Sequence, residues 1–150
     1  MNKSKRIYID TSVISAIFDQ RTPERMSLTK KMWENIDDYE VYISNIVIDE
    51  LKAAPEEKRK KFMDVISDFD ILEVTDEVKE LADEYIKEEI FPKKYYDDAL
   101  HVAIATVNDI GYLLSWNFKH LVKVKTRKLV SLVNTKYDYS SIEIIVPPEL

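Results

Sequence analysis

The sequence of 150 residues contains no cysteine, one glycine and only two histidines. The absence of cysteine excludes disulfide bonds, thiolate zinc sites and thiol nucleophiles. Two histidines, His101 and His120, are too few for the usual zinc sites built from histidine and cysteine. A metal ion bound by this chain therefore needs oxygen ligands, which favours Mg²⁺, Mn²⁺ or Ca²⁺.

Long apolar runs are also missing. No run of about 18 apolar residues occurs, so we expect no membrane span and no membrane partner. The first residues, MNKSKRIYID, turn charged before a signal-type apolar region can form, so we expect no targeting peptide and a cytoplasmic location. The length and apolar share predict a single domain over residues 1–150 with a sizeable core.

Acidic residues are absent from one part of an otherwise acidic chain. The net charge is −6, which is not typical of a nucleic-acid-binding protein taken as a whole. Between residues 110 and 137, however, there is no Asp or Glu, and the basic residues are Lys119, Lys123, Lys125, Arg127, Lys128 and Lys136. This segment predicts a local basic surface, either as a simple solvated helix face or as a binding rim.

Short β-branched and aromatic runs alternate with helical patterns along the whole chain. The predicted strands cover residues 5–9, 40–44, 70–74, 112–115 and 143–146. The predicted helices cover residues 13–18, 24–36, 45–54, 56–67, 76–90, an apolar stretch that begins at Asp97 and Asp98, 118–122 and 126–135. This alternation predicts an α/β domain, a three-layer α/β/α sandwich with a mostly parallel central sheet.

Local signals predict where several of these helices begin and end. Thr11 and Ser12 are expected to cap the first helix, and Asn45 the helix that follows the second strand. The single glycine, Gly111, is expected at the C′ position of the long apolar helix.

Acidic side chains come from three separate segments of this pattern. Asp10 ends the first strand, Glu50 lies in the helix after the second, and Asp98 begins the helix before the fourth. Asn117 follows the fourth strand and adds an amide. In parallel α/β sheets, functional groups collect at the carboxyl ends of the strands, so we expect these four side chains at one edge.

Helical spacing selects Glu50 over its neighbour Asp49. Glu50 follows the apolar Ile46 and Val47 by four and three residues, which places it at the border of the buried face. Asp49 lies about 200° around the helix from Val47 and is expected to face solvent.

The same reasoning favours Asp98 over Asp97. Asp98 shares a helix face with Val102 and Ala105, which are small enough for close packing on a sheet. Asp97 is expected to be a helix-start charge that interacts favourably with the helix dipole.

Three carboxylates held close together repel one another, and a divalent cation relieves that repulsion. Such an ion can orient and polarise a phosphate and activate water. An acidic pocket beside a basic rim is a suitable arrangement for cutting a polyanion.

Four segments of the sequence resemble the PIN domain family of nucleases, which includes the VapC-like toxins. They are IYIDTSV at 7–13, SNIVIDEL at 44–51, DALHVAIA at 98–105 and LLSWNF at 113–118. Together they span nearly the whole chain in the order that the family shows.

The resemblance implies a parallel α/β/α sandwich and Mg²⁺- or Mn²⁺-dependent hydrolysis of RNA phosphodiester bonds. It carries the metal-binding and catalytic acids onto Asp10, Glu50 and Asp98, in agreement with the helical faces. The family commonly has a fourth Asp two residues after a Ser or Thr, and here that position is Asn117 after Ser115. An amide oxygen at this metal-binding position brings no charge, so a second ion should bind weakly.

The expected partners are RNA, an antitoxin protein and a second copy of the chain in a homodimer, all by resemblance. The alternative is a PIN-fold module that binds RNA or a protein without cleaving. An aspartyl-phosphate phosphatase or receiver domain would show Asp–x–Asp after the strand, whereas position 12 is serine.

The remaining candidates have structural interpretations as well. His101 follows Asp98 by three residues and is expected to be a partly buried structural histidine. Trp116 and Tyr95 or Tyr96 are expected to pack in the core or at an interface, with base stacking as the alternative. Nothing in the sequence places His101 and His120 together as an acid–base pair.

Overall fold

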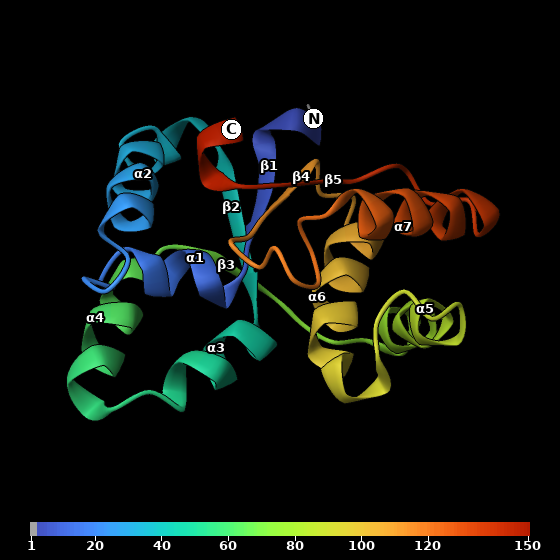
Figure 1. The fold of residues 1–150 in the computed structure, drawn as a ribbon, viewed down its shortest axis with the longest axis horizontal. Coiled ribbons are helices and arrows are strands. Elements are labelled where there is room, and N and C mark those ends of the chain that lie inside the picture. The colour runs from blue at the N-terminus through green and yellow to red at the C-terminus, as the bar shows by residue number, and fades with distance from the viewer. Residues whose placement is uncertain (1–2) are drawn as a thin grey trace.

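The computed structural model describes residues 3–150, which form a five-stranded sheet between two groups of helices (Figure 1). The strand order is β3-β2-β1-β4-β5, and every neighbouring pair is parallel. The strands are β1 (Arg6–Ile9), β2 (Glu40–Ser44), β3 (Asp70–Leu72), β4 (Tyr112–Leu114) and β5 (Glu143–Ile145). Because β1 lies at the centre, residues that follow it are flanked by the ends of β2 and β4.

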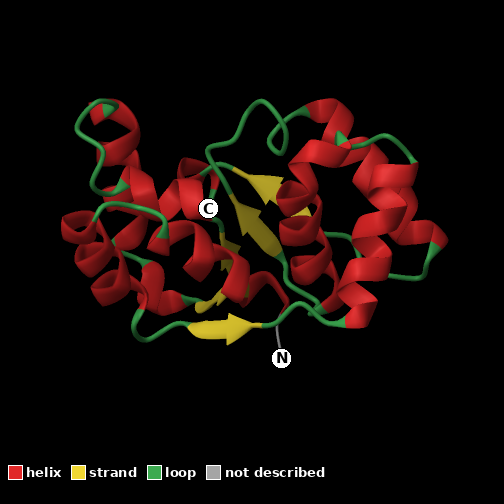
Figure 2. Ribbon diagram, turned by 90° about the horizontal axis from the view of Figure 1, so that it is seen from below, coloured by secondary structure: helices red, strands yellow, loops and turns green. Residues whose placement is uncertain are grey.

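The helices cover both faces of the sheet (Figures 1 and 2). One group contains α1 (Thr11–Ala16), α2 (Pro23–Trp33), α3 (Asn45–Lys52) and α4 (Glu56–Ile66). The other contains α5 (Asp76–Lys87), α6 (Tyr96–Val107) and α7 (Val124–Lys136). Short 3₁₀ helices are η1 (Lys3–Lys5), η2 (Ile36–Asp38), η3 (Lys93–Tyr95) and η4 (Pro147–Glu149). The predicted α/β/α sandwich is confirmed.

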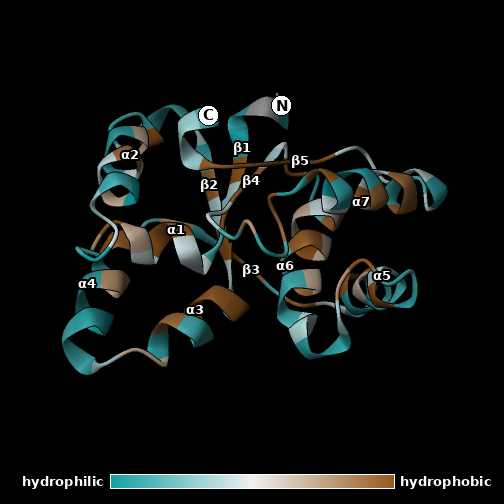
Figure 3. Ribbon diagram, in the orientation of Figure 1, coloured by the Kyte–Doolittle hydropathy of each residue, from teal (hydrophilic) through white to brown (hydrophobic). Residues whose placement is uncertain are grey.

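The core lies where the central strands meet helices from both sides. Ile7, Ile9, Leu113 and Leu114 are fully buried, as expected for parallel strands covered on both faces. Figure 3 shows these strands and the inner helix faces as the hydrophobic part of the ribbon. Although α6 is apolar on most sides, no helix in residues 3–150 is long and apolar enough to cross a membrane.

The caps of α1 and α3 differ from the predicted ones. Asp10, not Thr11 or Ser12, caps α1, because its extended backbone (φ −83°, ψ 173°) lets its carboxylate accept a hydrogen bond from Val13 N–H. Ser44 caps α3 in the same way, in place of Asn45. Each cap is therefore the polar group at the carboxyl end of a strand. The hydroxyls of Thr11 and Ser12 are left for other partners.

The predicted role of Gly111 was wrong. Helix α6 already ends at Val107, and the positive φ in the following turn belongs to Asp109 (φ 56°), a residue type that tolerates this region. Gly111 instead continues the sheet, because its N–H donates to the carbonyl of Arg6 and its carbonyl accepts from Glu143 N–H.

The segment after β4 forms one helix, α7, rather than the two predicted. Residues 118–122 form a turn that Asn117 holds together. Its side-chain oxygen accepts from His120 N–H, and its backbone carbonyl accepts from the N–H groups of Leu121 and Val122. Side-chain bonds of this kind compete with a regular helix, which explains the difference.

Candidate functional site

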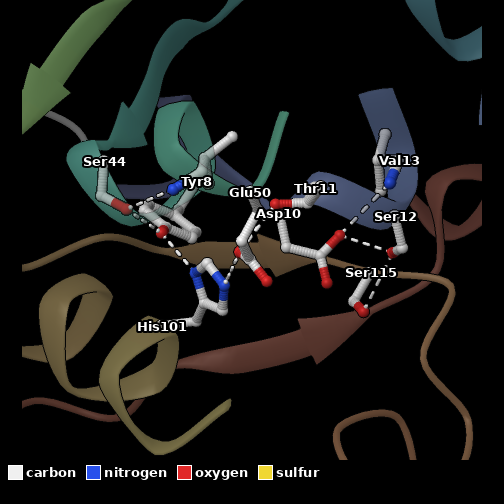
Figure 4. A network of polar contacts seen from close by, with 10 residues as sticks. Tyr8, Asp10, Thr11, Ser12, Val13, Ser44, Glu50, His101 and Ser115 are labelled. Carbon is white, nitrogen blue, oxygen red and sulfur yellow. Dashed lines mark hydrogen bonds and ion pairs between the residues drawn. The ribbon is translucent and has the colours of Figure 1, made fainter. Parts of the chain in front are cut away.

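Polar side chains gather at the carboxyl edge of the sheet, at the ends of β1, β2 and β4. Asp10, Ser44 and Ser115 directly follow or end these strands, and all three are buried. Figure 4 shows Asp10 and Glu50 in this region, with His101 of α6 in contact with Glu50. The site is thus assembled from strand ends and from helices on both faces.

Asp10 is held in place by two hydrogen bonds to one carboxylate oxygen. The Ser12 hydroxyl donates to Oδ1 at 2.5 Å, and Val13 N–H donates to the same atom at 3.2 Å. Only 4% of Asp10 is exposed. Burial raises its pKa, although His101 and the hydroxyls of Ser115 and Ser12 oppose the rise.

Glu50 is fixed by donors from opposite sides of the sheet. Thr11 Oγ1 donates to Glu50 Oε1 at 2.8 Å, and His101 Nε2 lies 2.9 Å from the same oxygen. Burial alone would raise the pKa of Glu50, but these two contacts lower it overall. Thr11 and His101 both contact the Oε1 atom of Glu50, and neither contacts its Oε2 atom. Asp49 faces solvent, as the helical spacing predicted.

Asp98 is half-buried in the first turn of α6, while Asp97 beside it is exposed. Burial raises the pKa of Asp98 to about 6; His101 opposes the rise, and the negative charges of Asp10, Glu50 and Asp97 add to it. The predicted Asp10 and Glu50 therefore lie near enough to Asp98 for their charges to raise its pKa.

His101 is buried, rather than partly buried as expected from the sequence, and both of its ring nitrogens have hydrogen-bond partners. Its second ring nitrogen, Nδ1, lies 2.6 Å from the hydroxyl of Tyr8, which lies 2.7 Å from the Ser44 hydroxyl. With the Glu50 contact, this makes a hydrogen-bonded chain from β2 through β1 and α6 to α3. The available signal was the three-residue spacing from Asp98, which puts both side chains on adjoining helix faces.

This chain accommodates both protonation states of His101. Burial raises the pKa of Tyr8, so its hydroxyl stays protonated. A neutral His101 can accept from Tyr8 at Nδ1 while Ser44 donates to Tyr8. A charged His101 donates from Nδ1, and Tyr8 then donates to Ser44. Burial opposes the charged form, but the contact with Glu50 raises the pKa of His101 overall.

Asn117 is connected to Asp10 through two serines. Its backbone N–H donates to Ser115 Oγ at 2.9 Å, Ser115 Oγ lies 3.4 Å from Ser12 Oγ, and Ser12 contacts Asp10. Its side-chain oxygen already accepts from His120 N–H at 3.0 Å. One lone pair of that oxygen remains for a metal ion or a water molecule.

The donor set fits a divalent ion of the Mg²⁺ or Mn²⁺ class. Carboxylate oxygens are the ligands that these ions prefer, and a cation would offset both the burial and the neighbouring negative charges that raise the pKa of Asp98. Within residues 3–150, no three acidic or histidine side chains already form a closed cage. The side chains would therefore have to adjust when an ion binds.

Basic groups lie close to the start of α6. His120 stacks on Tyr95 with ring centroids 4.1 Å apart. Burial lowers the pKa of His120, and the charges of Lys119, Lys123 and Lys94 lower it further. The basic segment predicted from the sequence thus gains a lysine from η3. Trp116 is buried, in agreement with the packing interpretation.

Several solved structures share this fold. One similar chain is VapC20 from Mycobacterium tuberculosis, described as a sarcin–ricin-loop-cleaving toxin, with 18% identity, a TM-score of 0.59, and coverage of 76% of this chain and 92% of that one. Another is a toxin–antitoxin complex from Klebsiella pneumoniae, with 17% identity, a TM-score of 0.59, and coverage of 80% of this chain and 93% of that one. A third is VapBC2 from Rickettsia felis, bound to a DNA fragment from its promoter, with 15% identity, a TM-score of 0.54, and coverage of 75% of this chain and 89% of that one. At these identities the likeness establishes the fold.

Comparison of the sequence itself gives the family. Curated protein sequences provide no match. The family model of the PIN domain matches residues 7–117, which include β1, β2, β4 and the three clustered acids. The chain belongs to the PIN domain family.

Proposed function

We propose that this protein is a divalent-metal-dependent endoribonuclease and the toxin of a toxin–antitoxin pair. The observation that carries the proposal is the placement of Asp10, Glu50 and Asp98, from the end of β1, from α3 and from α6, close enough in a PIN fold for the charges of Asp10 and Glu50 to act on Asp98. The structural likeness to a sarcin–ricin-loop-cleaving toxin and to toxin–antitoxin complexes supports the substrate class and the antitoxin partner.

Each residue has a distinct part in this proposal. Asp10, Glu50 and Asp98 would hold the Mg²⁺ or Mn²⁺ ion through carboxylate oxygens. When bound, the ion supplies a Lewis acid for a phosphoryl oxygen and makes water a better nucleophile. Thr11 and His101 keep Glu50 oriented through its Oε1, and Asn117 orients water or phosphate without adding charge.

The basic residues near α6 would hold the RNA backbone beside the acids. Lys94, Lys119 and Lys123 influence His120 at close range, so they form a local positive region on a chain of net charge −6. Such a region attracts phosphates despite the overall charge. The antitoxin, a homodimer and a cytoplasmic location accompany this proposal as further expectations.

Removal of one metal-binding carboxylate tests the proposal. We expect Asp10→Asn and Asp98→Asn each to lower Mn²⁺-dependent cleavage of single-stranded RNA by more than about a hundredfold. Loss of a residue that only supports a metal ligand costs up to about a hundredfold, and loss of the ligand itself should cost more. Gel assays of labelled RNA measure the rate, and circular dichroism checks folding. Asp97→Asn is the matched control, because it removes an exposed carboxylate next to Asp98 and should retain activity. Cleavage that persists in both folded variants would contradict the site assignment.

A second candidate is a PIN-fold module that binds RNA or a protein without cleaving it. Two observations favour it: the side-chain oxygen of Asn117 is engaged in the turn, and no closed cage of acids or histidines exists within residues 3–150. This candidate predicts no metal-dependent change in the protein, which separates it from the first.

A further inference from the structure

A pocket of about 220 Å³ lies beside the acidic cluster, between α1, the start of α2 and the segment after β4. Its lining includes Ser12, Asp19, Thr22, Arg25, Trp116 and Asn117. Ser12 belongs to both the pocket and the Asp10 site, because its hydroxyl donates to Asp10. The pocket is therefore the immediate neighbour of the proposed catalytic centre.

Trp116 forms a fixed wall of this pocket. Its backbone N–H donates to Ser12 Oγ at 2.9 Å, and its indole Nε1–H donates to Thr29 Oγ1 of α2 at 2.9 Å. Asp10 is thus two hydrogen bonds away from Trp116, through Ser12. A wall held at both ends keeps its position before any ligand arrives, which lowers the entropic cost of binding.

Arg25 carries the positive charge at the pocket. Its guanidinium carbon lies 5.4 Å from the centroid of the Trp116 ring and 5.5 Å from that of Phe118, so cation–π contacts with both rings hold it. Arg25 is exposed, and Phe118, which is 48% exposed, lies beside the pocket through its contact with Arg25 and is not part of the lining.

The polar lining of the pocket also suits an anion. Asn117 Oδ1 accepts from His120 N–H, so the amide NH₂ is the part of this side chain left to donate. The one carboxylate among these lining residues, Asp19, is paired with Arg21 through contacts of 2.9 and 3.1 Å. Its charge is therefore offset, and the guanidinium of Arg25 and the amide of Asn117 remain as donors at the pocket.

We propose that this pocket is a subsite for the nucleotide next to the scissile phosphate of single-stranded RNA. The inference rests on the proposed function and deepens it. Arg25 and Asn117 bind the phosphate oxygens, and Phe118 stacks on the base. The base must be unpaired to reach an aromatic face, which selects single strands. A donor pair beside an exposed ring matches a nucleotide better than an apolar protein segment.

The test measures binding separately from cleavage. Fluorescence anisotropy follows a labelled single-stranded RNA of mixed sequence at several salt concentrations, in EDTA so that no cleavage occurs. We expect Phe118→Ala to weaken binding by about five- to a hundredfold, the range for loss of one stacked base. Arg25→Gln should weaken it too and lower the slope of log affinity against log salt by about 0.7, the value for one lost phosphate contact on a single strand.

Arg59→Gln is the control for charge, since Arg59 is exposed on α4, away from this pocket, and the change in charge is the same. Arg25→Lys should restore the salt slope. The inference is wrong if the folded Arg25 and Phe118 variants bind as the wild type does, or if the wild type binds no RNA. Loss of the proposed function is a separate result: wild-type protein that binds RNA through these residues but does not cleave it with Mn²⁺ supports the subsite and contradicts the nuclease.

Discussion

At the scale of single residues, the three acids of the site differ in how strongly they hold a proton. The pKa of Asp98 is raised to about 6 by burial and neighbouring charge, that of Asp10 is also raised by burial, and that of Glu50 is lowered by His101 and Thr11. In the metal-free protein the cluster therefore favours a charged Glu50 next to a protonated His101.

This pattern predicts how stability depends on pH without metal. The folded-state pKa values of Asp98 and His101 are both raised, so their contributions are present at low pH and are lost as pH rises through those values. We expect Asp98 to lower the melting temperature in EDTA as the pH rises from about 4 to about 6, and His101 to lower it further above about pH 6.5. Glu50 acts in the opposite direction only at lower pH, because its pKa is lowered. Thermal scans at fixed ionic strength measure the effect.

The contribution of Asp98 is isolated by substitution. Asp98→Asn should reduce the fall in melting temperature between about pH 4 and about pH 6, since it removes a carboxyl whose pKa is raised from 3.8 to about 6 by folding. Asp97→Asn, which removes the exposed neighbouring carboxylate, should leave most of the fall in melting temperature in place. Equal pH dependence in wild type and Asp98→Asn would show that Asp98 has no raised pKa.

At the scale of elements, α6 is decisive because it carries both Asp98 and His101. It packs against α5 and α7 around a buried polar contact, in which Tyr85 Oη of α5 donates to Asn134 Oδ1 of α7 at 2.5 Å. The Asn134 side-chain N–H in turn lies 3.3 Å from Thr106 Oγ1 of α6. The three helices are thus tied together near the end of α6 that is remote from Asp98.

We predict that Tyr85→Phe destabilises the fold by about 1–3 kcal/mol, because it leaves the buried oxygen of Asn134 without its donor. Urea unfolding measures the loss. Tyr139→Phe removes a hydroxyl that donates to Glu77 in an exposed position and should cost less than about 1 kcal/mol. RNA cleavage by folded Tyr85→Phe should persist. Equal stabilities of the two variants would contradict the importance of this contact.

At the scale of the whole molecule, an acidic chain of net charge −6 concentrates carboxylates at one sheet edge. A cation that bound only the native state would relieve the energetic cost of that concentration. A ligand of this kind must stabilise the fold, by about 2.7 kcal/mol when its free concentration is about 100 times its Kd.

We therefore predict that saturating Mn²⁺ raises the melting temperature by about 5–10 °C for a chain of this length. Differential scanning fluorimetry with and without the ion provides the measurement. Asp10→Asn should lose the shift, and Asp97→Asn should keep it. An unchanged midpoint in the wild type would favour the non-cleaving module instead.

The order of residues alone is enough to predict the alternation of strands and helices, the fold class, and that Glu50 and Asp98 are more buried than their neighbours Asp49 and Asp97. These features depend on the periodic spacing of apolar and polar side chains within one helix or strand, which residues close together in the sequence are enough to show. The four segments that resemble the PIN domain family also indicate the identity of the fold.

Which polar groups meet depends on the tertiary structure. Glu50 and His101 are 51 residues apart in the chain, Tyr8 and His101 are 93 apart, and Trp116 and Thr29 are 87 apart. No local pattern records such pairs, because the order of the parallel strands and the packing of helices on both faces bring them together. For the same reason the sequence indicated neither the hydrogen-bond partners of His101 nor the pocket at Arg25.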